Sequence, residues 1–437
     1  MTSFLLRHSF LPLLPCTTES PSRKRYSSIV RSVAGPPREE SIVIVGAGIG
    51  GLATAVSLKR LGIEAVVIEQ GESLRTTGTS LGVFKNGWRV LDSIGVGDEL
   101  RTQFAKLKGL CFRSEDGKEL ASMSIEGIPG QEIRPVERRV LLETLAKKLP
   151  PDTIRFSSGM KSIQQNGNGK LLLDLDDGTQ LLAKIVIGAD GVRSRVAKWM
   201  GFPEPRYVGQ CAFRGVAIYP EGQPFGQKLS NFYGRGLRIG CIPVSATKLY
   251  WFVVYNASSP GPKIQDPIAL KKVALELIRN CPADIQAIVE KTPDESILKT
   301  RLVDRWLWPV VSPSGSSGGA VVIGDAWHPM TPNLGQGACS TLEDAISLAL
   351  KIGEAIGGDP QNINRALVEY SKERWSRVSY LTVRSYLVGS FLQWENPLIC
   401  GIRDRIIIPK FLNLDQFLSH TNFECPLLPE SSIQNPK

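Results

Sequence analysis

The sequence predicts an α/β fold in which a doubly wound, Rossmann-like sheet is combined with an interposed antiparallel β-rich domain and C-terminal helices. Three observations predict it. An apolar, β-branched run enters a glycine-rich turn and a helical pattern at residues 42–58. A strand that ends in a turn containing Gly and Asp recurs at residues 184–196 and 320–337. Between those two segments, residues 205–300 alternate short β-rich stretches, which is typical of an antiparallel sheet.

These segments divide the chain into five parts. We expect a targeting peptide at residues 1–38 and a nucleotide-binding domain in two parts, at residues 39–204 and 301–390. The β-rich substrate domain lies between those parts at residues 205–300, and a C-terminal tail follows at residues 391–437.

The formal charge of +10 is concentrated at the N-terminus. The first 38 residues hold six Arg and Lys against one acid, Glu19, which is a net charge of +5 and half of the total. The other half is spread over the remaining chain without a dense basic run. We therefore expect a solvated surface and no nucleic-acid partner.

Residues 1–38 have the composition of a removable targeting peptide. They are rich in Ser and Thr, poor in acids, and end in Pro36-Pro37 just before the first convincing strand. Their apolar stretch, residues 4–14, is interrupted by a basic pair and a proline, so it is a poor secretory core and too short to span a membrane. We expect a chloroplast transit peptide, with mitochondrial import as the alternative, and no transmembrane segment.

Eight cysteines are scattered along the chain without a CxxC pair, so we expect neither a metal site nor a disulfide framework. They are typical of reduced, mostly buried small hydrophobic residues. They stand at positions 16, 111, 211, 241, 281, 339, 400 and 425.

A complete dinucleotide-binding fingerprint opens the folded part of the chain. Residues 42–45 form a β-branched strand, residues 46–51 read Gly-Ala-Gly-Ile-Gly-Gly, and a helical pattern follows. A second apolar run, residues 65–68, ends in Glu69, which lies 23 residues after Gly46. Strand, turn, helix and acid all occur at the spacing of a βαβ nucleotide-binding unit.

Each residue of this fingerprint has a physical task. Gly46 permits the tight turn, Gly48 lets a pyrophosphate approach the backbone, and Gly51 allows close packing of helix on strand. The helix N-terminus offers unpaired N–H groups to the phosphates, and Glu69 can accept hydrogen bonds from a ribose. The fingerprint by itself does not distinguish FAD from NAD.

Two later segments make that distinction. In residues 184–196 an apolar strand runs into a turn that contains Asp190, and in residues 320–337 another runs through Asp325 towards a helix. With these motifs the chain resembles the aromatic-hydroxylase class of FAD-dependent monooxygenases, the group of para-hydroxybenzoate and salicylate hydroxylases and zeaxanthin epoxidase. The resemblance covers residues 41–385. Four shorter segments narrow it to the plant monooxygenase branch: residues 74–78, 86–91, 213–215 and 234–238.

The resemblance implies FAD as the cofactor and assigns residues to it. In this family the Gly46 turn and Glu69 bind the ADP half of FAD, and an arginine that matches Arg138 contacts the cofactor. Asp190 belongs to a motif associated with both the flavin pyrophosphate and the nicotinamide nucleotide. Asp325 contacts the ribityl and pyrophosphate region. The segment beside the isoalloxazine ring comprises Pro332, Gly335, Gln336 and Gly337.

Physical reasoning from the residues supports parts of this assignment and leaves alternatives open. A Gly335-Gln336-Gly337 turn that opens a helix directs backbone N–H groups at a flavin, which suits the negative charge of the reduced ring. Asp325 can accept hydrogen bonds from sugar hydroxyls or serve as the N-cap of the next helix. Asp190 could equally be a turn residue, with Arg193 or Arg195 as a solvated partner.

Two other features are interpreted as structural. His328 lies inside the Asp325 motif, and we expect it to be neither a base nor a metal ligand. The Trp306-Leu307-Trp308-Pro309 segment faintly resembles a flavin-halogenase motif, but it lacks the Ile-Pro ending, so we interpret it as packing.

The substrate side is predicted at the antiparallel sheet of residues 205–300. A sheet laid across one face of the flavin would form a pocket, to which we assign Arg214, Tyr233 and Tyr255, with Trp251 as a further candidate. Each aromatic residue could instead belong to the core or to a cross-strand pair. Arg214 is the best-placed cation for holding a carboxylate or phenolate, and its alternative is a surface ion pair.

The sequence therefore predicts an enzyme that takes hydride from NADPH or NADH and hydroxylates a small, aromatic or anionic substrate with oxygen through a flavin C4a-hydroperoxide. The cofactor supplies this chemistry, so no catalytic triad or metal set is needed. Two alternatives remain. One is an FAD-dependent reductase or dehydrogenase of the geranylgeranyl-reductase kind, and the other is a flavin-binding regulatory protein with little turnover.

Overall fold

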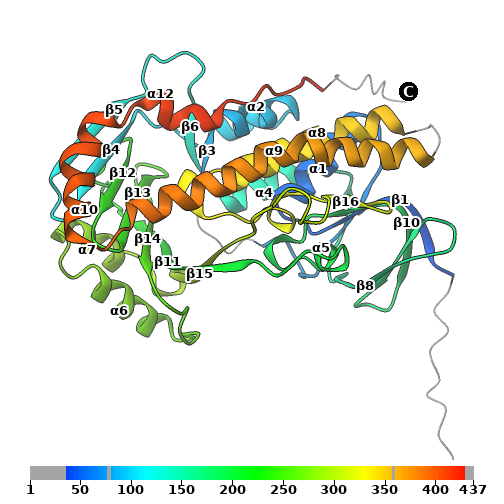
Figure 1. Cartoon of the computed structure of the whole chain (residues 1–437), viewed down its shortest axis with the longest axis horizontal. Coiled ribbons are helices and arrows are strands. Elements are labelled where there is room, and N and C mark those ends of the chain that lie inside the picture. Colours follow the sequence, from blue (N-terminus) through cyan, green and yellow to red (C-terminus); the bar gives the residue numbers. More distant parts are fainter. Residues whose placement is uncertain (1–35, 76–79, 357–359, 429–437) are drawn as a thin grey trace, which may run out of the picture. The chain divides into compact units, whose positions relative to one another are not determined.

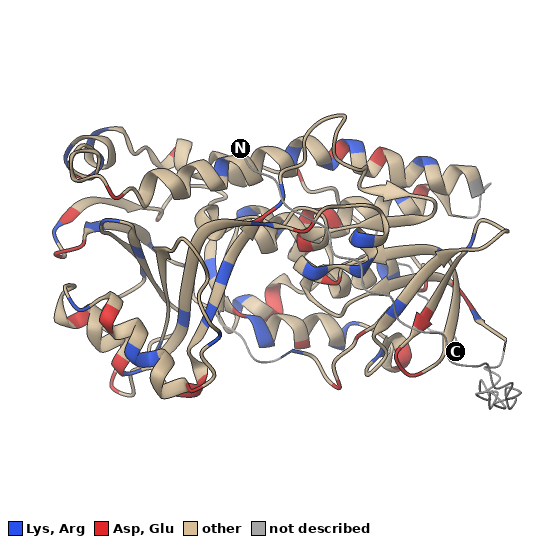
Figure 2. Ribbon diagram, turned by 60° about the horizontal axis from the view of Figure 1, so that its bottom comes forward, with Lys and Arg blue, Asp and Glu red and all other residues tan. Residues whose placement is uncertain are grey.

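The computed structural model describes residues 36–75, 80–356 and 360–428. In these ranges the chain forms two large sheets, a two-stranded sheet and helices that cover them (Figure 1). The α/β class, the combination of parallel and antiparallel sheets and the helical C-terminal region are confirmed. Basic and acidic residues are interspersed over these elements (Figure 2). No helix in the described ranges is both long and apolar enough to cross a membrane.

The first sheet is the nucleotide-binding sheet, which has eight strands among the described residues. They are β1 (Arg38–Val45), β2 (Val66–Ile68), β7 (Ile154–Arg155), β8 (Met160–Gln165), β9 (Leu171–Leu175), β10 (Gln180–Gly188), β16 (Ser316–Ser317) and β17 (Ala320–Val322). The path is β16-β17-β10-β1-β2-β7, with β9 on β10 and β8 on β9. The pairs from β17 to β7 are parallel, and β16, β9 and β8 join in antiparallel fashion.

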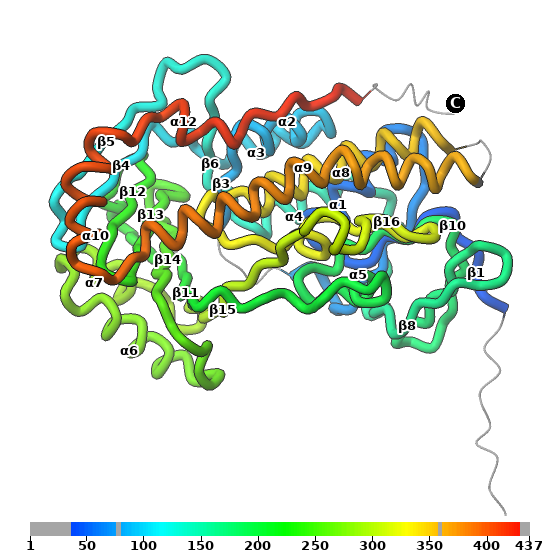
Figure 3. Tube along the Cα trace, viewed as in Figure 1, coloured from blue at the N-terminus to red at the C-terminus, as the bar shows by residue number. Residues whose placement is uncertain are grey.

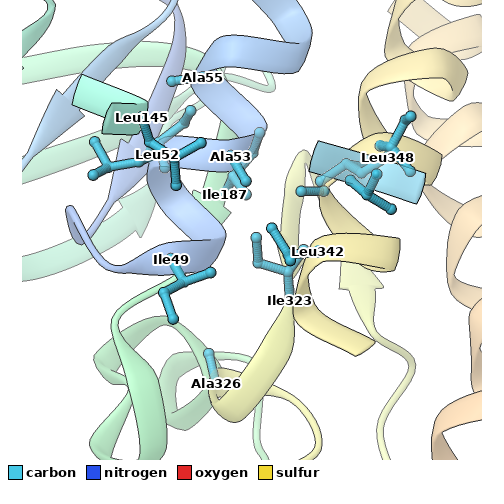
Figure 4. Packing of buried hydrophobic residues seen from close by; sticks show 14 of the residues in the cluster. Ile49, Leu52, Ala53, Ala55, Leu145, Ile187, Ile323, Ala326, Leu342 and Leu348 are labelled. Atoms are coloured by element: carbon cyan, nitrogen blue, oxygen red, sulfur yellow. The ribbon is translucent and has the colours of Figure 1, made fainter. Parts of the chain in front are cut away.

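Helices cover the central strands of this sheet, whose apolar runs are therefore buried throughout. Residues 42–45 of β1 are at most 5% exposed, which is the pattern of a parallel sheet with no solvated face. Helix α1 (Ile49–Arg60) packs against α8 (Gly337–Ala355) and α4 (Arg138–Lys147). Figure 4 shows apolar side chains of α1 and α8 meeting in this core.

The second sheet, which we call the substrate sheet, has seven strands among the described residues. They are β4 (Gly109–Ser114), β5 (Glu119–Ser124), β11 (Arg206–Ile218), β12 (Lys228–Tyr233), β13 (Leu237–Pro243), β14 (Lys248–Asn256) and β15 (Leu298–Asp304). Their order is β15-β11-β14-β13-β12-β4-β5, and neighbours are antiparallel except for the parallel pair β12 and β4. Helices α6 (Pro267–Leu277) and α7 (Ala283–Glu290) contribute to the apolar cluster on one face.

The substrate sheet extends beyond residues 205–300. That segment forms its antiparallel centre, as predicted, but β4 and β5 come from residues 109–124 and β15 ends at Asp304. The segment is therefore not self-contained. Local pattern predicts a strand but not its partner, and β4 joins the sheet by pairing with a strand far along the chain.

The remaining elements connect and cover the sheets. Strands β3 (Ser80–Phe84) and β6 (Ile133–Glu137) form the two-stranded sheet. The remaining α-helices of the described residues are α2 (Lys85–Ser93), α3 (Gly97–Arg101), α5 (Arg195–Trp199), α9 (Pro360–Leu392), α10 (Pro397–Ile402), α11 (Ile408–Phe411) and α12 (Leu414–Leu418). The C-terminal segment returns to α2 (Figure 3), where Arg89 donates a 2.6 Å hydrogen bond to the carbonyl of Phe423. The described part of the predicted tail, residues 391–428, is thus largely helical and packed on the fold.

Candidate functional site

The glycine turn between β1 and α1 has the geometry that the fingerprint requires. Gly46 has a φ of +104°, and a Cβ there would lie 2.7 Å from the carbonyl oxygen of Ala189. A Cβ on Gly51 would lie 1.9 Å from the carbonyl oxygen of Gly46. A Cβ on Gly48, in contrast, would meet no atom within 4 Å. The backbone at Gly48 is therefore open to a ligand, whereas the fold itself requires glycine at the other two positions.

Glu69 follows the last residue of β2 and fixes the glycine turn. Its Oε2 accepts a 2.8 Å hydrogen bond from the backbone N–H of Ala47, and its Oε1 accepts one of 2.9 Å from Gly71. The sequence predicts that Glu69 accepts hydrogen bonds from a ribose. A carboxylate has about four acceptor positions, so Glu69 can hold the turn and still accept a hydrogen bond from a sugar.

Two adjoining cavities begin at this turn. The Glu69 cavity has a volume of about 430 Å³ and extends from the turn to Glu69 and Asp190. The Asp325 cavity has a volume of about 480 Å³ and extends from the turn to the substrate sheet. Both are lined by Gly48, Arg138, Ala189 and Gly191. An elongated ligand could therefore extend from one cavity into the other.

Arg138, the first residue of α4, lies where the two cavities meet. Its Nε is buried and has no hydrogen-bond partner. Burial lowers the pKa of its guanidinium, and the neighbouring charge of Arg75 lowers it further. A buried, unpaired cation is costly without an anion, so this position suits a phosphate group.

The two carboxylate oxygens of Asp190 have different surroundings: one is hydrogen-bonded within the fold, and the other is left for a ligand in the Glu69 cavity. Oδ2 accepts a 2.7 Å hydrogen bond from the backbone N–H of Arg195, as expected of a turn residue, while Oδ1 is buried without a partner. Burial raises the pKa of this carboxyl group. Arg195 also donates a side-chain hydrogen bond to the carbonyl of Met160. Turn formation and ligand contact are therefore compatible at Asp190.

Asp325 faces the second cavity from the short 3₁₀ turn Gly324–Ala326. Asp325 is exposed and borders this cavity, and desolvation by the surrounding protein raises the pKa of its carboxyl group. His328 and Arg138 oppose that shift. The N-cap alternative is wrong, because Gln336 is the N-cap residue of the following helix α8.

The turn before α8 lines the Asp325 cavity mainly with backbone. Pro332, Gly335 and Gly337 are lining residues, and Gly335 has a φ of +64° beside the ring of Phe84. Gln336 is different. Its side chain is fully buried and accepts a 2.8 Å hydrogen bond from Asn86, so it points away from the cavity.

A buried ionic network lies behind the Asp325 motif. Asp344 Oδ2 accepts hydrogen bonds from the backbone N–H of Gly324 at 2.9 Å and from His328 Nε2 at 2.6 Å, and its Oδ1 accepts one from Arg374 at 2.8 Å. Arg374 also pairs with Glu343 at 2.8 Å. His328 thus has a structural contact, as predicted. No role was predicted for the adjacent acids of α8, although two consecutive acids in an apolar helix are the signal for such a network.

Arg214, which the sequence predicts at the substrate pocket, faces the Asp325 cavity from β11. It is half-buried and makes no hydrogen bond or ion pair with the described residues. It pairs across the strands with Phe252 of β14, which lines the same cavity together with Tyr250 and Val254. These alternate residues define the face of β14 that forms the cavity wall.

Tyr255 and Trp251 lie on the other face of β14, contrary to the prediction that they line the pocket. Tyr255 stacks on Phe213 with ring centroids 5.8 Å apart, and Trp251 Nε1 donates a 2.8 Å hydrogen bond to Thr292. Most of β14 is buried on both faces, so its sequence has no apolar and polar alternation that would identify the cavity side. Tyr250, which the prediction missed, is the tyrosine that lines the cavity.

Tyr233 lies on the cavity face of the sheet but does not reach the cavity. It pairs across the strands with Arg238, stacks on Phe112 at 6.3 Å and contacts the guanidinium of Arg403 at 5.6 Å. Burial raises the pKa of its hydroxyl to about 12. The C-terminal segment that contributes Arg403 covers Tyr233, and this contact is not visible from local sequence.

The tryptophan segment before β16 is packed only in part: Leu307 is buried, as the packing interpretation predicts, whereas Trp308 is exposed. Trp306 donates a 2.9 Å hydrogen bond to Asp304, lies under the guanidinium of Arg206 and contacts Trp308 at 5.4 Å.

Comparisons with known proteins identify the family. The chain matches the family described as FAD binding domain over residues 39–385. It is 36% identical over 399 residues to Monooxygenase 2 of Arabidopsis thaliana, which covers 88% of this chain and 97% of that protein. It is 26% identical over 351 residues to an FAD-dependent urate hydroxylase of Klebsiella pneumoniae, with 78% and 88% of the two chains covered. Klebsiella pneumoniae HpxO, solved with FAD and uric acid, has the same fold, with a TM-score of 0.77 at 23% identity over 87% of this chain and 96% of that chain.

The two cavities agree with these relationships, because the open backbone at Gly48 and the unpaired atoms of Arg138 and Asp190 are features that a dinucleotide would satisfy. The chain belongs to the FAD-binding-domain family and is an FAD-dependent monooxygenase of the aromatic-hydroxylase type.

Proposed function

We propose that this monooxygenase oxidises NADPH or NADH and uses oxygen to hydroxylate a small aromatic or anionic molecule bound in the Asp325 cavity. The residues that line this cavity support the proposal. Asp325, Pro332 and Gly335 line one part of it, and Arg214 and Phe252 line another. A flavin held by the first group would lie beside a substrate held by the second.

The residues around the cavities have the chemistry that FAD needs. FAD, when bound, would accept hydride and activate oxygen. Arg138 and the Gly48 backbone would hold the pyrophosphate, Glu69 the adenosine ribose and Asp325 the ribityl hydroxyls. Gly337 begins the 19-residue helix α8, whose N–H groups and dipole favour negative charge beside its N-terminus.

The substrate sheet supplies the apolar part of the cavity. Its lining side chains exclude water from the place where oxygen is transferred, and a dry site favours hydroxylation over the release of hydrogen peroxide. These side chains are Ile242, Phe252, Val254, Leu302 and Val303.

Arg214 is the residue that we assign to the substrate. A half-buried guanidinium without a carboxylate partner favours a carboxylate or phenolate, which it can hold through paired hydrogen bonds. The structure of HpxO with uric acid supports a small ring compound as the class of substrate.

Oxygen uptake by the purified, flavin-loaded chain tests this function. We expect NADPH or NADH to be oxidised with matching oxygen consumption, and a substrate to accelerate both. Reduction of a substrate without oxygen would instead favour the reductase alternative. Bound flavin that neither nucleotide reduces would favour the regulatory alternative.

We also propose import into chloroplasts, with mitochondria as the alternative. The support is the composition of residues 1–38, nearly all of which lie outside the described residues, and β1 begins at Arg38, the last residue of the proposed peptide. A fluorescent reporter fused to residues 1–38 should enter plastids. Cytosolic fluorescence would contradict a targeting role, and mitochondrial fluorescence would select the alternative.

A further inference from the structure

A second arginine of the substrate sheet, Arg238, lines the Asp325 cavity together with Arg214. Arg238 is only 4% exposed, and its Nε is buried without a hydrogen-bond partner. No ion pair joins it to any acid among the described residues. Burial lowers the pKa of its guanidinium, and the charge of Arg214 lowers it further. The cavity wall thus contains a charged group that the protein alone leaves uncompensated.

The register of the sheet sets Arg214 and Arg238 on the same face. Arg214 of β11 pairs with Phe252 of β14, and Arg238 of β13 pairs with Val254 of the same strand. Paired residues share a face, and so do residues two apart on one strand. Because β14 runs between β11 and β13, the two arginines flank Phe252.

Gly240 makes room for the ring that supports Arg238. A Cβ on Gly240 would lie 2.1 Å from the ring of Phe252, so this ring occupies the space above the glycine. The guanidinium of Arg238 lies 5.2 Å from the centre of the same ring. A cation–π contact offsets part of the cost of burying a cation but does not neutralise its charge.

The cavity has an excess of positive charge. Its lining includes four arginines, Arg138, Arg214, Arg238 and Arg301, and Asp325 as its acidic residue. The proposed function uses Arg138 and Asp325 for FAD. Arg301 is exposed, so water screens its charge. Arg214 and Arg238 then remain on the substrate side, of which Arg238 is the more deeply buried.

We propose that Arg238 is a second substrate-binding residue, which together with Arg214 selects a planar anion over its neutral isostere. The substrate class is an aromatic or heterocyclic acid that is ionised at neutral pH and lies near the ring of Phe252. This inference rests on the proposed function in one respect only, namely that the substrate occupies the Asp325 cavity.

Titration of the FAD-loaded full chain with benzoate and benzamide tests the proposal, because the two probes have nearly the same shape and only benzoate is charged. Binding is followed by the change in flavin absorbance. The wild-type protein should bind benzoate at least about tenfold more tightly than benzamide, and Arg238→Gln should weaken benzoate binding about 10- to 100-fold, which is the range for a lost charge-assisted hydrogen bond. Benzamide binding should change less than about threefold, because a neutral amide loses no charge pairing.

Two further variants separate charge from structure. Arg301→Gln removes an exposed arginine from the same cavity and should alter the preference for benzoate by less than about threefold. Arg238→Lys keeps the charge and should retain part of the preference. Without a ligand, Arg238→Gln should melt at the same or a higher temperature than the wild-type protein, because it removes an unpaired buried charge. If Arg238 served only to stabilise the fold, Arg238→Gln would instead lower the melting temperature.

Three results would overturn the proposal. In the first, the wild-type protein shows no preference for benzoate, and in the second, Arg238→Gln keeps the wild-type preference. In the third, Arg238→Gln binds benzoate and benzamide more weakly by the same factor and also melts at a lower temperature. The proposed function fails separately. A protein that prefers benzoate but consumes no oxygen with NADPH or NADH would retain the anion site and refute the monooxygenase reaction. A protein that consumes oxygen but does not distinguish the probes would refute the anion site alone.

Discussion

The carbonyl oxygen of Gly46 lies only 1.9 Å from the position that a Cβ on Gly51 would occupy. The same backbone turn leaves the space at Gly48 empty to beyond 4 Å. Two glycines that belong to one fingerprint therefore serve different ends. Gly51 allows α1 to pack against the turn, and Gly48 leaves room for a ligand.

We predict that substitution of Gly51 affects the stability of the fold, whereas substitution of Gly48 affects the binding of FAD. Gly51→Ala should destabilise the protein by about 3 kcal/mol, because backbone must move to relieve the overlap. Gly48→Val should fold, since its φ of −79° and ψ of −173° are accessible to valine, but it should lose FAD. Thermal unfolding of the flavin-free proteins and flavin absorbance per chain measure the two effects. Stoichiometric FAD in Gly48→Val would show that the turn does not hold the cofactor.

Asp344 connects the fold to the loop that carries Asp325. Burial alone would raise the pKa of Asp344, but His328 and Arg374 outweigh it, so the pKa of this carboxyl in the folded protein lies below its usual value. A carboxyl with a lowered pKa in the folded state stabilises the protein above the pKa of the unfolded chain, and this contribution is lost as the pH falls further. The loss should occur below about pH 4.

The substitution Asp344→Asn tests this connection. It should lower the free energy of unfolding at neutral pH by about 3 to 5 kcal/mol, because it leaves Arg374 buried with weaker pairing. It should also reduce the fall in the free energy of unfolding that the wild-type protein shows below about pH 4. Glu373→Gln, which removes an exposed ion pair with Lys351, is the control and should cost less than about 1 kcal/mol. Chemical denaturation between pH 3 and about pH 7 measures both variants, and an unchanged fall at acid pH in Asp344→Asn would exclude this role.

The two faces of β14 predict different behaviour for its two tyrosines. Tyr250→Phe removes a hydroxyl from the cavity and should change the Michaelis constant or the turnover of a substrate. Tyr255→Phe alters the opposite face, where the ring stacks on Phe213, and should leave both constants within about twofold. Steady-state kinetics of the Tyr250→Phe and Tyr255→Phe variants measure this difference. A larger effect at Tyr255 than at Tyr250 would contradict the assignment of the faces.

The contrast between the glycine turn and these tyrosines explains which parts of the site the sequence could predict. Gly46, Gly48, Gly51 and Glu69 act within one βαβ unit, so their spacing along the chain already contains their geometry. The cavity face of β14 depends on what covers each side of the sheet, and a strand that is apolar on both sides carries no sign of it.

Long-range pairing limited the prediction elsewhere. Tyr233 is covered by Phe112, which β4 brings beside β12, and by Arg403 from the C-terminal segment. Arg238 was part of a recognised motif, but its lack of a partner became visible only when the three strands β11, β14 and β13 were in register.

Arg214→Ala should weaken substrate binding and divert reducing equivalents. FAD binding should remain, and substrate affinity should fall by about 2 to 3 kcal/mol, as expected for a lost charge-assisted contact. A poorly held substrate leaves activated oxygen to decay, so hydrogen peroxide per NADPH should rise. Arg235→Ala, at an exposed position of the turn between β12 and β13, should alter neither quantity. Unchanged affinity and coupling in Arg214→Ala would remove this residue from the substrate site.

We propose that the enzyme inserts one atom of molecular oxygen into its substrate and oxidises one reduced nicotinamide in doing so. Small aromatic acids and phenols can be screened for those that accelerate NADPH or NADH oxidation by the flavin-loaded protein. The product of an accelerating compound is then formed under isotopically labelled oxygen and examined by mass spectrometry. We expect one labelled oxygen atom per product molecule and one nicotinamide oxidised per product. Product that forms without oxygen, or that takes its new oxygen atom from water, would exclude this reaction.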